Sequence, residues 1–253
     1  QNEEFVFEID ENGEAVLVGY HGKGGNVTVP KEWNGAAVTA VAPLAFVNKQ
    51  SLRSVTLPST VKSIGDYAFT YCEGLTSITI PNSVESIGNY AFYQCFSLTE
   101  IVIPDTVTSI GQYAFHGCIS LEKVTIPNTV SSMGSYVFSG CISLKRMNST
   151  TDGAITLPTR LTVIPSYAFN GCTEIAKVVV GDITEIQSYA FSGCESITQF
   201  NSNNNDELIV PNGVTRIGDY AFQNLSSITK IVFGGTSIPS HICADIKNLE
   251  SVE

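Results

Sequence analysis

The side chains most able to do chemistry in this sequence are cysteines, and six of the seven recur at one fixed place. Each of the six follows, by five residues, a tyrosine that opens a repeated motif: Cys72, Cys95, Cys118, Cys141, Cys172 and Cys194. A zinc site or a redox pair needs closely spaced cysteines such as C-x-x-C, a spacing that the sequence lacks. Because the spacing follows the repeat, we predict a column of buried thiols that behave as small apolar side chains. Disulfide bonds or a metal site are the alternatives.

Other chemical signatures are weak. The sequence contains no phosphate-binding P-loop, no G-x-S-x-G nucleophile turn and no H-E-x-x-H zinc motif. The three histidines, His21, His116 and His241, are scattered along the chain. The glycine cluster at 22–25 leads from one predicted strand into another, which favours a loop over a phosphate site. We therefore predict no enzyme activity, no catalytic residue, no cofactor and no metal site.

The cysteines belong to a repeat that defines the fold. The triplet Tyr67-Ala68-Phe69 recurs every 23 residues as far as Tyr136-Val137-Phe138, and nine copies are present in all. Two later intervals are 31 residues long, so these units carry eight extra residues, between Met147 and Pro158 and between Phe200 and Pro211. A period of about 20–50 residues is typical of solenoids, in which each unit buries its apolar face against its neighbours. We predict a single domain over residues 1–253.

Each unit is expected to contain a strand and a turn. Ile78 and Ile80 alternate with polar neighbours, which indicates a half-buried strand that ends at Pro81. An Asp, Asn or Ser usually precedes the motif tyrosine, so we predict a capped helical turn over the motif. Most units have a glycine two residues before the tyrosine, but one has Pro165, whose φ is fixed near about −65°. We therefore expect this glycine to serve close packing between coils rather than a left-handed backbone.

The two ends are expected to differ from the repeats. Apolar residues at 5–9 and 15–18 alternate around Glu11-Asn12-Gly13, which predicts a hairpin that caps the first coil. The cap would span 1–25 and the repeats 26–253. Because the chain begins at Gln1 rather than Met, we expect that a leader has been removed, as in an exported protein. Residues 249–252 begin another strand, so either a partner covers its edge by strand pairing or the native chain is longer.

A row of basic residues is predicted on the outward face of the strands. In a chain of net charge −11, such a cationic stripe beside the two inserted loops favours an acidic partner, whereas nucleic acid is excluded by the small number of Lys and Arg, 13. The alternative is that these are solvated strand residues that discourage edge pairing. The candidate ligand-binding face consists of Lys123, Arg146, Lys177, Gln199 and Lys230, and the candidate binding loops contribute Asn148, Thr151, Asp152, Asn203, Asn204 and Asp206.

The unit L-x-x-I-x-I-P-x-x-V-x-x-I-G-x-Y-A-F-x-x-C-x-S, as it stands in Leu75 to Ser97, closely resembles the leucine-rich repeat of the BspA-like family. The resemblance covers about residues 26–253. It implies an α/β solenoid, right-handed, with a parallel concave β-sheet and about nine repeats of 23 residues. It also implies a bacterial protein that is exported or attached to the cell surface, and it supplies no catalytic residues.

The function that follows is a binding or adhesion module. Its partner would be a host or neighbouring-cell protein or an acidic glycan, held by the concave sheet face and the inserted loops. The alternatives are a structural spacer that displays another domain, or an enzyme. No apolar run approaches the roughly 18 residues that a membrane helix needs, so we expect no transmembrane segment. The sequence leaves the ligand, the mode of anchoring and the oligomeric state open.

Overall fold

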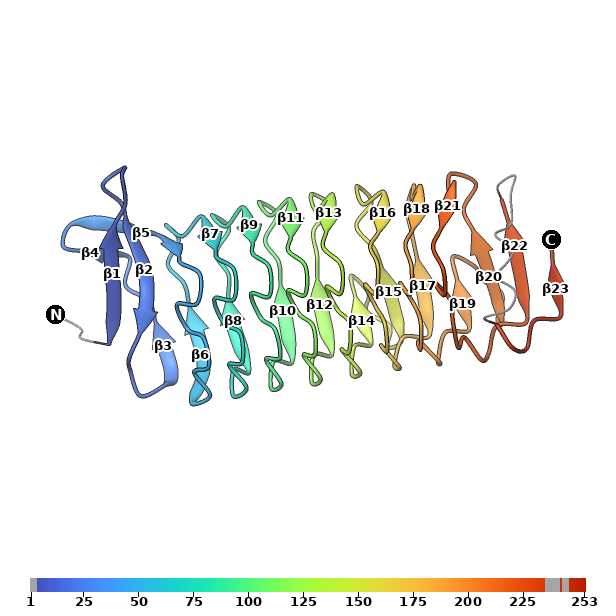
Figure 1. Ribbon diagram of the computed structural model, residues 1–253, viewed down its shortest axis with the longest axis horizontal. Coiled ribbons are helices and arrows are strands. Elements are labelled where there is room, and N and C mark those ends of the chain that lie inside the picture. Colours follow the sequence, from blue (N-terminus) through green and yellow to red (C-terminus); the bar gives the residue numbers. More distant parts are fainter. Residues whose placement is uncertain (1–3, 235–241, 243–245) are drawn as a thin grey trace.

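The computed structural model describes residues 4–234, 242 and 246–253. The chain forms an elongated stack of coils, with a hairpin at the N-terminal end and the strand β23 at the other end (Figure 1). Short strands and turns make up the described residues, and none of these residues is helical. The predicted α/β class is therefore wrong in this respect, and the fold is a β-solenoid of mainly parallel strands.

One side of every coil contributes a strand to what we call the main strand column. Its strands pair in parallel in two sheets, β3-β6-β8 and β10-β12-β14-β15-β17-β19-β20-β22-β23, and a shift of register occurs between β3 and β6. Its members are β3 (Gly25–Thr28), β6 (Leu52–Thr56), β8 (Ser77–Thr79), β10 (Glu100–Val102), β12 (Lys123–Thr125), β14 (Arg146–Met147), β15 (Ala154–Thr156), β17 (Lys177–Val179), β19 (Gln199–Phe200), β20 (Glu207–Val210), β22 (Lys230–Phe233) and β23 (Ser251–Val252).

A second series of strands, two residues long except for β5, forms the minor strand column and lies along the upper side of the view in Figure 1. Its N-terminal part continues the sheet that begins with the hairpin, and β4 (Glu32–Trp33) pairs with β5 in antiparallel fashion. Its members are β5 (Ala36–Val41), β7 (Ser63–Ile64), β9 (Ser86–Ile87), β11 (Ser109–Ile110), β13 (Ser132–Met133), β16 (Val163–Ile164), β18 (Glu185–Ile186) and β21 (Arg216–Ile217).

The N-terminal hairpin joins the stack through its second strand. Strands β1 (Phe5–Ile9) and β2 (Ala15–Tyr20) pair antiparallel, and β2 pairs in parallel with β5. The Asp10 carboxylate accepts hydrogen bonds from the backbone N–H groups of Asn12 and Glu14, both at 2.9 Å, and these bonds tighten the turn. The Tyr20 ring lies 5.3 Å from Phe46, so the hairpin extends the aromatic core of the first coil.

The motif segments are turns and not the capped helical turns that the sequence predicts. The motif tyrosines have positive φ values, for example +58° at Tyr67, which no helix allows. Alternate backbone N–H groups point to the next coil: Tyr67 donates to Asn89 O at 2.8 Å and Phe69 donates to Ala91 O at 2.7 Å. The expected capping carboxylate of Asp66 instead accepts the backbone N–H of Asn89 in the next coil, at 2.7 Å. The next coil thus supplies carbonyl partners for backbone N–H groups that would lack partners at the start of a helical turn.

The glycines before the motif serve close packing, as predicted. Gly88, Gly111 and Gly134 do not adopt the left-handed backbone, yet a side chain would not fit. A Cβ atom on Gly134 would lie 2.2 Å from the backbone nitrogen of Gln112 in the preceding coil. The coils therefore touch backbone to backbone at this column.

Like residues form ladders through the core. Eight motif phenylalanines are fully buried, and Phe92 and Phe115 are stacked with ring centroids 5.3 Å apart. The six predicted cysteines form a buried column of free thiols, so the disulfide alternative is wrong for these six; Cys243 lies outside the described residues. Each thiol donates to the phenylalanine carbonyl of the preceding coil, as Cys118 does to Phe92 O at 3.2 Å. Burial raises the pKa of Cys118 to about 12.

The two insertions add strands without adding motif turns. After β14 the chain loops back and forms β15, which pairs in parallel with β14, and β19 and β20 are related in the same way. Eight of the nine motif copies lie within the described residues, and the ninth, at 241–243, lies outside them apart from Ile242. The main strand column therefore has more rungs than the motif turns have copies.

The minor strand column is interrupted beside the first insertion. Within the described residues, β13 pairs only with β11 and β16 pairs only with β18. In neighbouring coils the glycine N–H donates to the preceding coil, as Gly111 does to Ile87 O at 2.9 Å. The coil of β16 has Pro165 at this position, which has no N–H to donate. The proline thus accounts for one missing bond of the interrupted ladder.

Candidate binding surfaces

The predicted basic residues lie in one row on the outward face of the main strand column. Glu100, Lys123 and Arg146 are directly opposite one another in neighbouring strands, and Lys177 pairs in register with Gln199. The added strands place two further residues in the same row: Ala154 between Arg146 and Lys177, and Glu207 between Gln199 and Lys230. Sequence reasoning missed these two. The eight-residue length of each insertion was the available signal, because it allows one return loop and one strand.

Most of the cations in this row are paired with carboxylates of the same chain. Lys123 Nζ lies 2.6 Å from Glu100 Oε1, and Lys230 Nζ lies 2.9 Å from Glu253 Oε2. Arg146 Nε lies 2.9 Å from Asp152 Oδ1, an ion pair whose geometry does not qualify as a hydrogen bond.

Lys177 differs from the other three cations in its partner. Its Nζ donates to the amide oxygen of Asn203 at 3.3 Å, and this neutral group leaves its charge uncompensated.

The first inserted loop is held by its asparagine. Asn148 Oδ1 accepts the backbone N–H of Ile126 at 2.9 Å, and its Nδ2 donates to Thr156 O at 3.0 Å. The backbone N–H of Thr151 donates to Ser149 Oγ at 3.1 Å. Through the ion pair of Asp152 with Arg146, this loop lies against the row of strand residues.

The second inserted loop folds over a buried carboxylate. Glu207 is 6% exposed, and its carboxylate accepts hydrogen bonds from Ser202 Oγ and, at 2.9 Å, from Asn204 Nδ2. These bonds, that of Ser202 above all, lower the pKa of Glu207. Gln199 Nε2 donates to Asn205 Oδ1 at 2.7 Å.

Asp206 ends this loop at a φ of +62°, and its carbonyl accepts the N–H of Thr229 at 2.9 Å. The structure thus brings the predicted row and both predicted loops onto one surface, which we call the sheet face.

The sheet face also carries a second row, which sequence reasoning did not single out. These residues lie two positions after the charged row, on the same side of each strand, and Val102 among them is 53% exposed. The signal was present, because the position is β-branched in strand after strand. The row consists of Thr56, Thr79, Val102, Thr125, Thr156, Val179, Ile209 and Val232.

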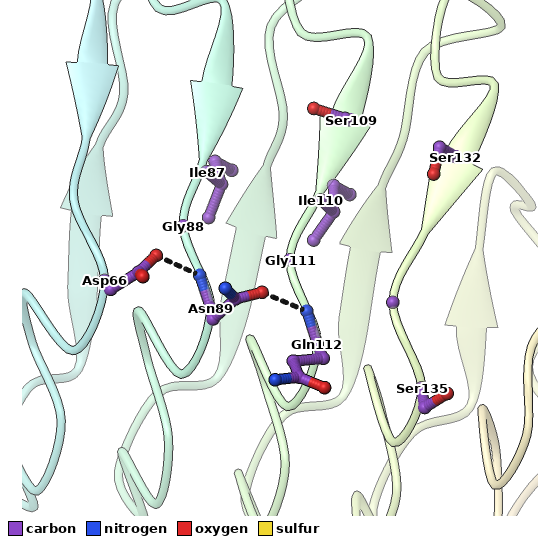
Figure 2. Close-up of a pocket in the computed structure, with 11 residues that line it drawn as sticks. Asp66, Ile87, Gly88, Asn89, Ser109, Ile110, Gly111, Gln112, Ser132 and Ser135 are labelled. Carbon is purple, nitrogen blue, oxygen red and sulfur yellow. Dashed lines mark hydrogen bonds between the residues drawn. The ribbon is translucent and has the colours of Figure 1, made fainter.

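A separate hollow lies along the minor strand column. We call it the glycine groove; its volume is about 550 Å³, and it runs beside β9, β11 and β13 (Figure 2). Gly88, Gly111 and Gly134 form part of its lining. Polar side chains from successive coils complete the wall: Asp66, Asn89, Ser109, Gln112, Ser132 and Ser135.

The motif tyrosines follow directly after this wall and form a stack of their own. Their ring centroids are 4.2–4.9 Å apart from Tyr67 to Tyr220. Burial within the stack raises the pKa of Tyr136 to about 12. Because the ring faces cover one another, the stack presents ring edges and hydroxyl groups.

The histidines do not come together. His116 packs against the Tyr93 ring at 5.2 Å, and burial lowers its pKa. His21 lies beside the hairpin, where its backbone N–H donates to Glu4 O at 2.6 Å. His241 lies outside the described residues. Among the residues that the structure describes, no group of three His, Cys, Asp or Glu is placed to hold a metal ion. The same part of the chain contains no helix that could span a membrane.

Comparison with known proteins agrees with the repeat seen in the fold. Residues 39–153 and 147–253 match the model of the BspA type leucine rich repeat region (6 copies). No curated protein matches the chain significantly.

Two solved structures have similar folds. One is the T. pallidum leucine rich repeat protein TpLRR, with 25% identity, a TM-score of 0.66 and coverage of 100% of this chain and 97% of that one. The other is a leucine-rich repeat protein from Bacteroides ovatus, with 24% identity, a TM-score of 0.76 and coverage of 99% and 75%. The family match extends over most of the sequence, so this chain belongs to the BspA-type leucine-rich repeat family.

Proposed function

We propose that this chain is a non-enzymatic binding module of an exported or cell-surface protein, and that its sheet face holds a host or neighbouring-cell protein or an acidic glycan. Family membership supports a binding or structural role. The observation that carries the proposal is the arrangement of the sheet face, where Arg146, Lys177 and Gln199 contact both inserted loops. Loops fixed on a rigid sheet are a common way to build a binding surface.

The ion pairs of the sheet face are compatible with an acidic partner. The Lys123 and Glu100 side chains are 41% and 47% exposed, and exposed pairs of this kind contribute only about 0–1 kcal/mol. A carboxylate or sulfate of the partner therefore replaces the internal acid at little cost. Lys177, whose own partner is neutral, would contact the ligand most directly.

The test begins with a screen of the isolated chain against extracellular-matrix proteins and arrays of acidic glycans. A ligand found there is then titrated against Lys177→Glu and against a triple neutralisation, Lys123→Gln, Arg146→Gln and Lys230→Gln. Neutralisation is chosen because a glutamate at 123 or 230 would face Glu100 or Glu207. We expect both variants to weaken binding at least about tenfold, or ~1.4 kcal/mol.

The matched control is Lys62→Gln, since Lys62 also forms an exposed ion pair, with Glu14 at 3.3 Å, but lies outside the charged row of the sheet face. It should bind like the unaltered chain. Unchanged binding by the Lys177→Glu variant would remove the sheet face from the proposal.

A structural spacer is the second candidate, and one observation favours it. Three of the four cations in the row are already paired with acids of the same chain, as expected for a surface that needs no ligand. In a spacer, none of the sheet-face variants would alter any interaction of the full-length protein, whereas deletion of whole coils would change the reach of the domain it displays.

The finer features of the fold belong to the same proposal. We infer a single right-handed domain over residues 1–253, with about nine repeats, a concave main sheet and the hairpin as its N-terminal cap; family membership and the pairing of β2 with β5 support this. Edge pairing of β23 with a second copy also stays a prediction. Size-exclusion chromatography over a range of concentrations tests it, with a constant monomer size as the contrary result.

A further inference from the structure

The glycine groove is formed by backbone that no side chain fills. A Cβ atom on Gly111 would lie 2.5 Å from Asn89 N, and one on Gly134 would lie 2.2 Å from Gln112 N. In these coils glycine is therefore required for the close approach to the preceding coil, and a hollow of about 550 Å³ lies beside them. This volume falls within the range of about 300–1,000 Å³ that is usual for ligand sites.

The hydroxyl groups of the groove lack partners, unlike those of a neighbouring column. Thr106 Oγ1 donates to Val84 O at 2.6 Å, and Thr129 Oγ1 donates to Val107 O at 3.0 Å, each bonding the preceding coil. Within the described part of the chain, no partner is found for the hydroxyls of Ser109, Ser132 and Ser135. These groups are both donors and acceptors, and Figure 2 shows them along successive coils.

The side chain of Gln112 adds a carboxamide to the same wall. Its backbone N–H is bonded to Asn89 Oδ1 at 2.9 Å, while no partner is found for its side chain among the described residues. The groove thus offers hydroxyl and amide groups that repeat with the spacing of the coils, which is about 4.8 Å between strands.

Charge and pairing restrict the ligand class. Among the described residues that line the groove, none is Lys, Arg or His, and the one acid is Asp66, in a chain of net charge −11. An anionic ligand would therefore meet no compensating charge. Among the described strands, β9 and β11 are paired on both sides, so an extended peptide could join the groove only at the outer edge of β13.

From these observations we propose that the glycine groove binds a neutral linear glycan, whose hydroxyl groups bond to Ser109, Gln112, Ser132 and Ser135 along the axis of the stack. This site is separate from the sheet face and does not depend on the function proposed for it. The groove lining comes from four successive coils, so a short oligosaccharide lying parallel to the stack would contact the equivalent positions of neighbouring coils, Ser109 with Ser132 and Gln112 with Ser135.

The experiment is a titration of the whole chain with short neutral oligomers of β-1,4-glucan, α-1,4-glucan, β-1,3-glucan and mannan. Calorimetry and NMR measure the binding. An oligogalacturonate serves as the anionic probe. We expect at least one neutral oligomer to bind, and binding to fall at least about tenfold in the double variant Ser109→Ala with Ser132→Ala. The double variant should keep the melting temperature, because these hydroxyls have no partners to lose.

The matched control is the double variant Thr106→Ala with Thr129→Ala, which removes hydroxyls that bond the adjacent coil. It should lower the melting temperature and leave glycan affinity unchanged. Lys177→Glu should also leave it unchanged, which separates this site from the sheet face. The proposal is overturned if no neutral oligomer binds, if the anionic probe binds as tightly as the neutral ones, or if the serine variant binds as well as the unaltered chain.

Discussion

The main strand column and the motif turns stack the same coils, but they respond differently to insertion. Across the first insertion the main column gains β15, yet Tyr136 and Tyr167 remain 4.2 Å apart. Across the second it gains β20, and Tyr189 and Tyr220 are 4.9 Å apart. The motif turns therefore set the pitch of the stack, whereas the sheet absorbs changes in length. Surface variation in this fold is accommodated on the sheet side.

The insertions still leave marks on the core. Phe200, at the end of β19, packs its edge against Phe191 and Phe222, with 5.2 Å between centroids in both cases. Phe191 and Phe222 are 6.0 Å apart, compared with 5.3 Å for Phe92 and Phe115. The side chain of the strand before the added rung thus fills the wider space between two coils. The difference between the main strand column and the motif turns can be tested by perturbing each of them in turn.

The largest effect is expected at alkaline pH, which acts on the buried thiols of the motif turns. Burial raises the pKa of Cys72, Cys118 and Cys194 from 9.0 to about 12, and it also raises the pKa of the other three described thiols. A raised pKa in the folded state gives stability that is complete below the unfolded value and is lost as pH rises through the folded value. We expect cooperative unfolding between pH 9 and 12, followed by circular dichroism.

The variant Cys118→Ser sharpens this experiment. Serine keeps a donor for Phe92 O but does not ionise in this range, so the alkaline midpoint should move upward. A midpoint that stays the same would show that the thiols do not drive the transition.

The next largest effect is expected from truncating one ring of the phenylalanine ladder. Phe115 is fully buried between Phe92 and Phe138, and its replacement by alanine should lower the free energy of unfolding by about 3–5 kcal/mol. The control on the sheet face is Val102→Ala, because Val102 is 53% exposed; it should change the free energy by no more than about 0.5 kcal/mol. Urea titration measures both. Equal losses of unfolding free energy would refute the difference between the motif turns and the main strand column.

A smaller loss is expected when the close approach of the coils is blocked. Gly134→Ala forces a Cβ atom to within 2.2 Å of Gln112 N, and overpacking of this kind costs about 1–3 kcal/mol. Gly181→Ala is the matched control, since its Cβ atom would meet Thr159 at an ordinary 3.5 Å. Thermal denaturation should separate the two variants clearly. A Gly134→Ala protein as stable as the control would mean that the coils can move apart.

The smallest effects are expected from single charges on the sheet face. Lys230→Glu places a carboxylate beside Glu207 and Glu253, so the melting temperature should fall. Lys177→Glu replaces a cation whose partner is the neutral Asn203, and the melting temperature should hardly change. The fall at position 230 should shrink in high salt, because screening weakens the repulsion from Glu253, whose side chain is 62% exposed. A fall of equal size at both positions would contradict the assigned pairing.

Much of the architecture could be predicted from the sequence because the repeat makes each position count many times. The thiol column, the phenylalanine ladder and the packing role of Gly88 and Gly134 all follow from spacing, and the structure confirms them. The prediction of a helical turn was wrong. Asp66 and Asn89 have the residue types of N-caps, but their side-chain oxygens accept backbone N–H groups of the next coil. A single unit considered alone gives no sign of partners supplied by its neighbour.

The candidate site was only partly accessible to prediction. Lys177 and Asn203 were each named from residue type, and the structure places them in contact. The prediction lacks the intervening residues Glu207 and Ala154, because the turn-forming residues of the insertions indicate loops and each insertion also supplies a strand. The glycine groove was also missed, because its wall combines residues from several coils that are unremarkable in any one of them.

The positive φ of the motif tyrosines has a consequence for how such an array grows. A non-glycine residue in this conformation costs about 1–2 kcal/mol, whereas one aromatic contact returns about 0.5–1.5 kcal/mol. A tyrosine stacked between two others, such as Tyr167, makes two contacts and offsets its strain; Tyr67, at the start of the stack, makes one with Tyr90. The equivalent residue one coil earlier, Leu44, has a φ of +65° and no ring at all. A tyrosine with this backbone conformation is therefore favourable only where it stacks between two other tyrosines. A newly duplicated coil would keep its motif tyrosine most readily when the coil arises in the interior of the stack.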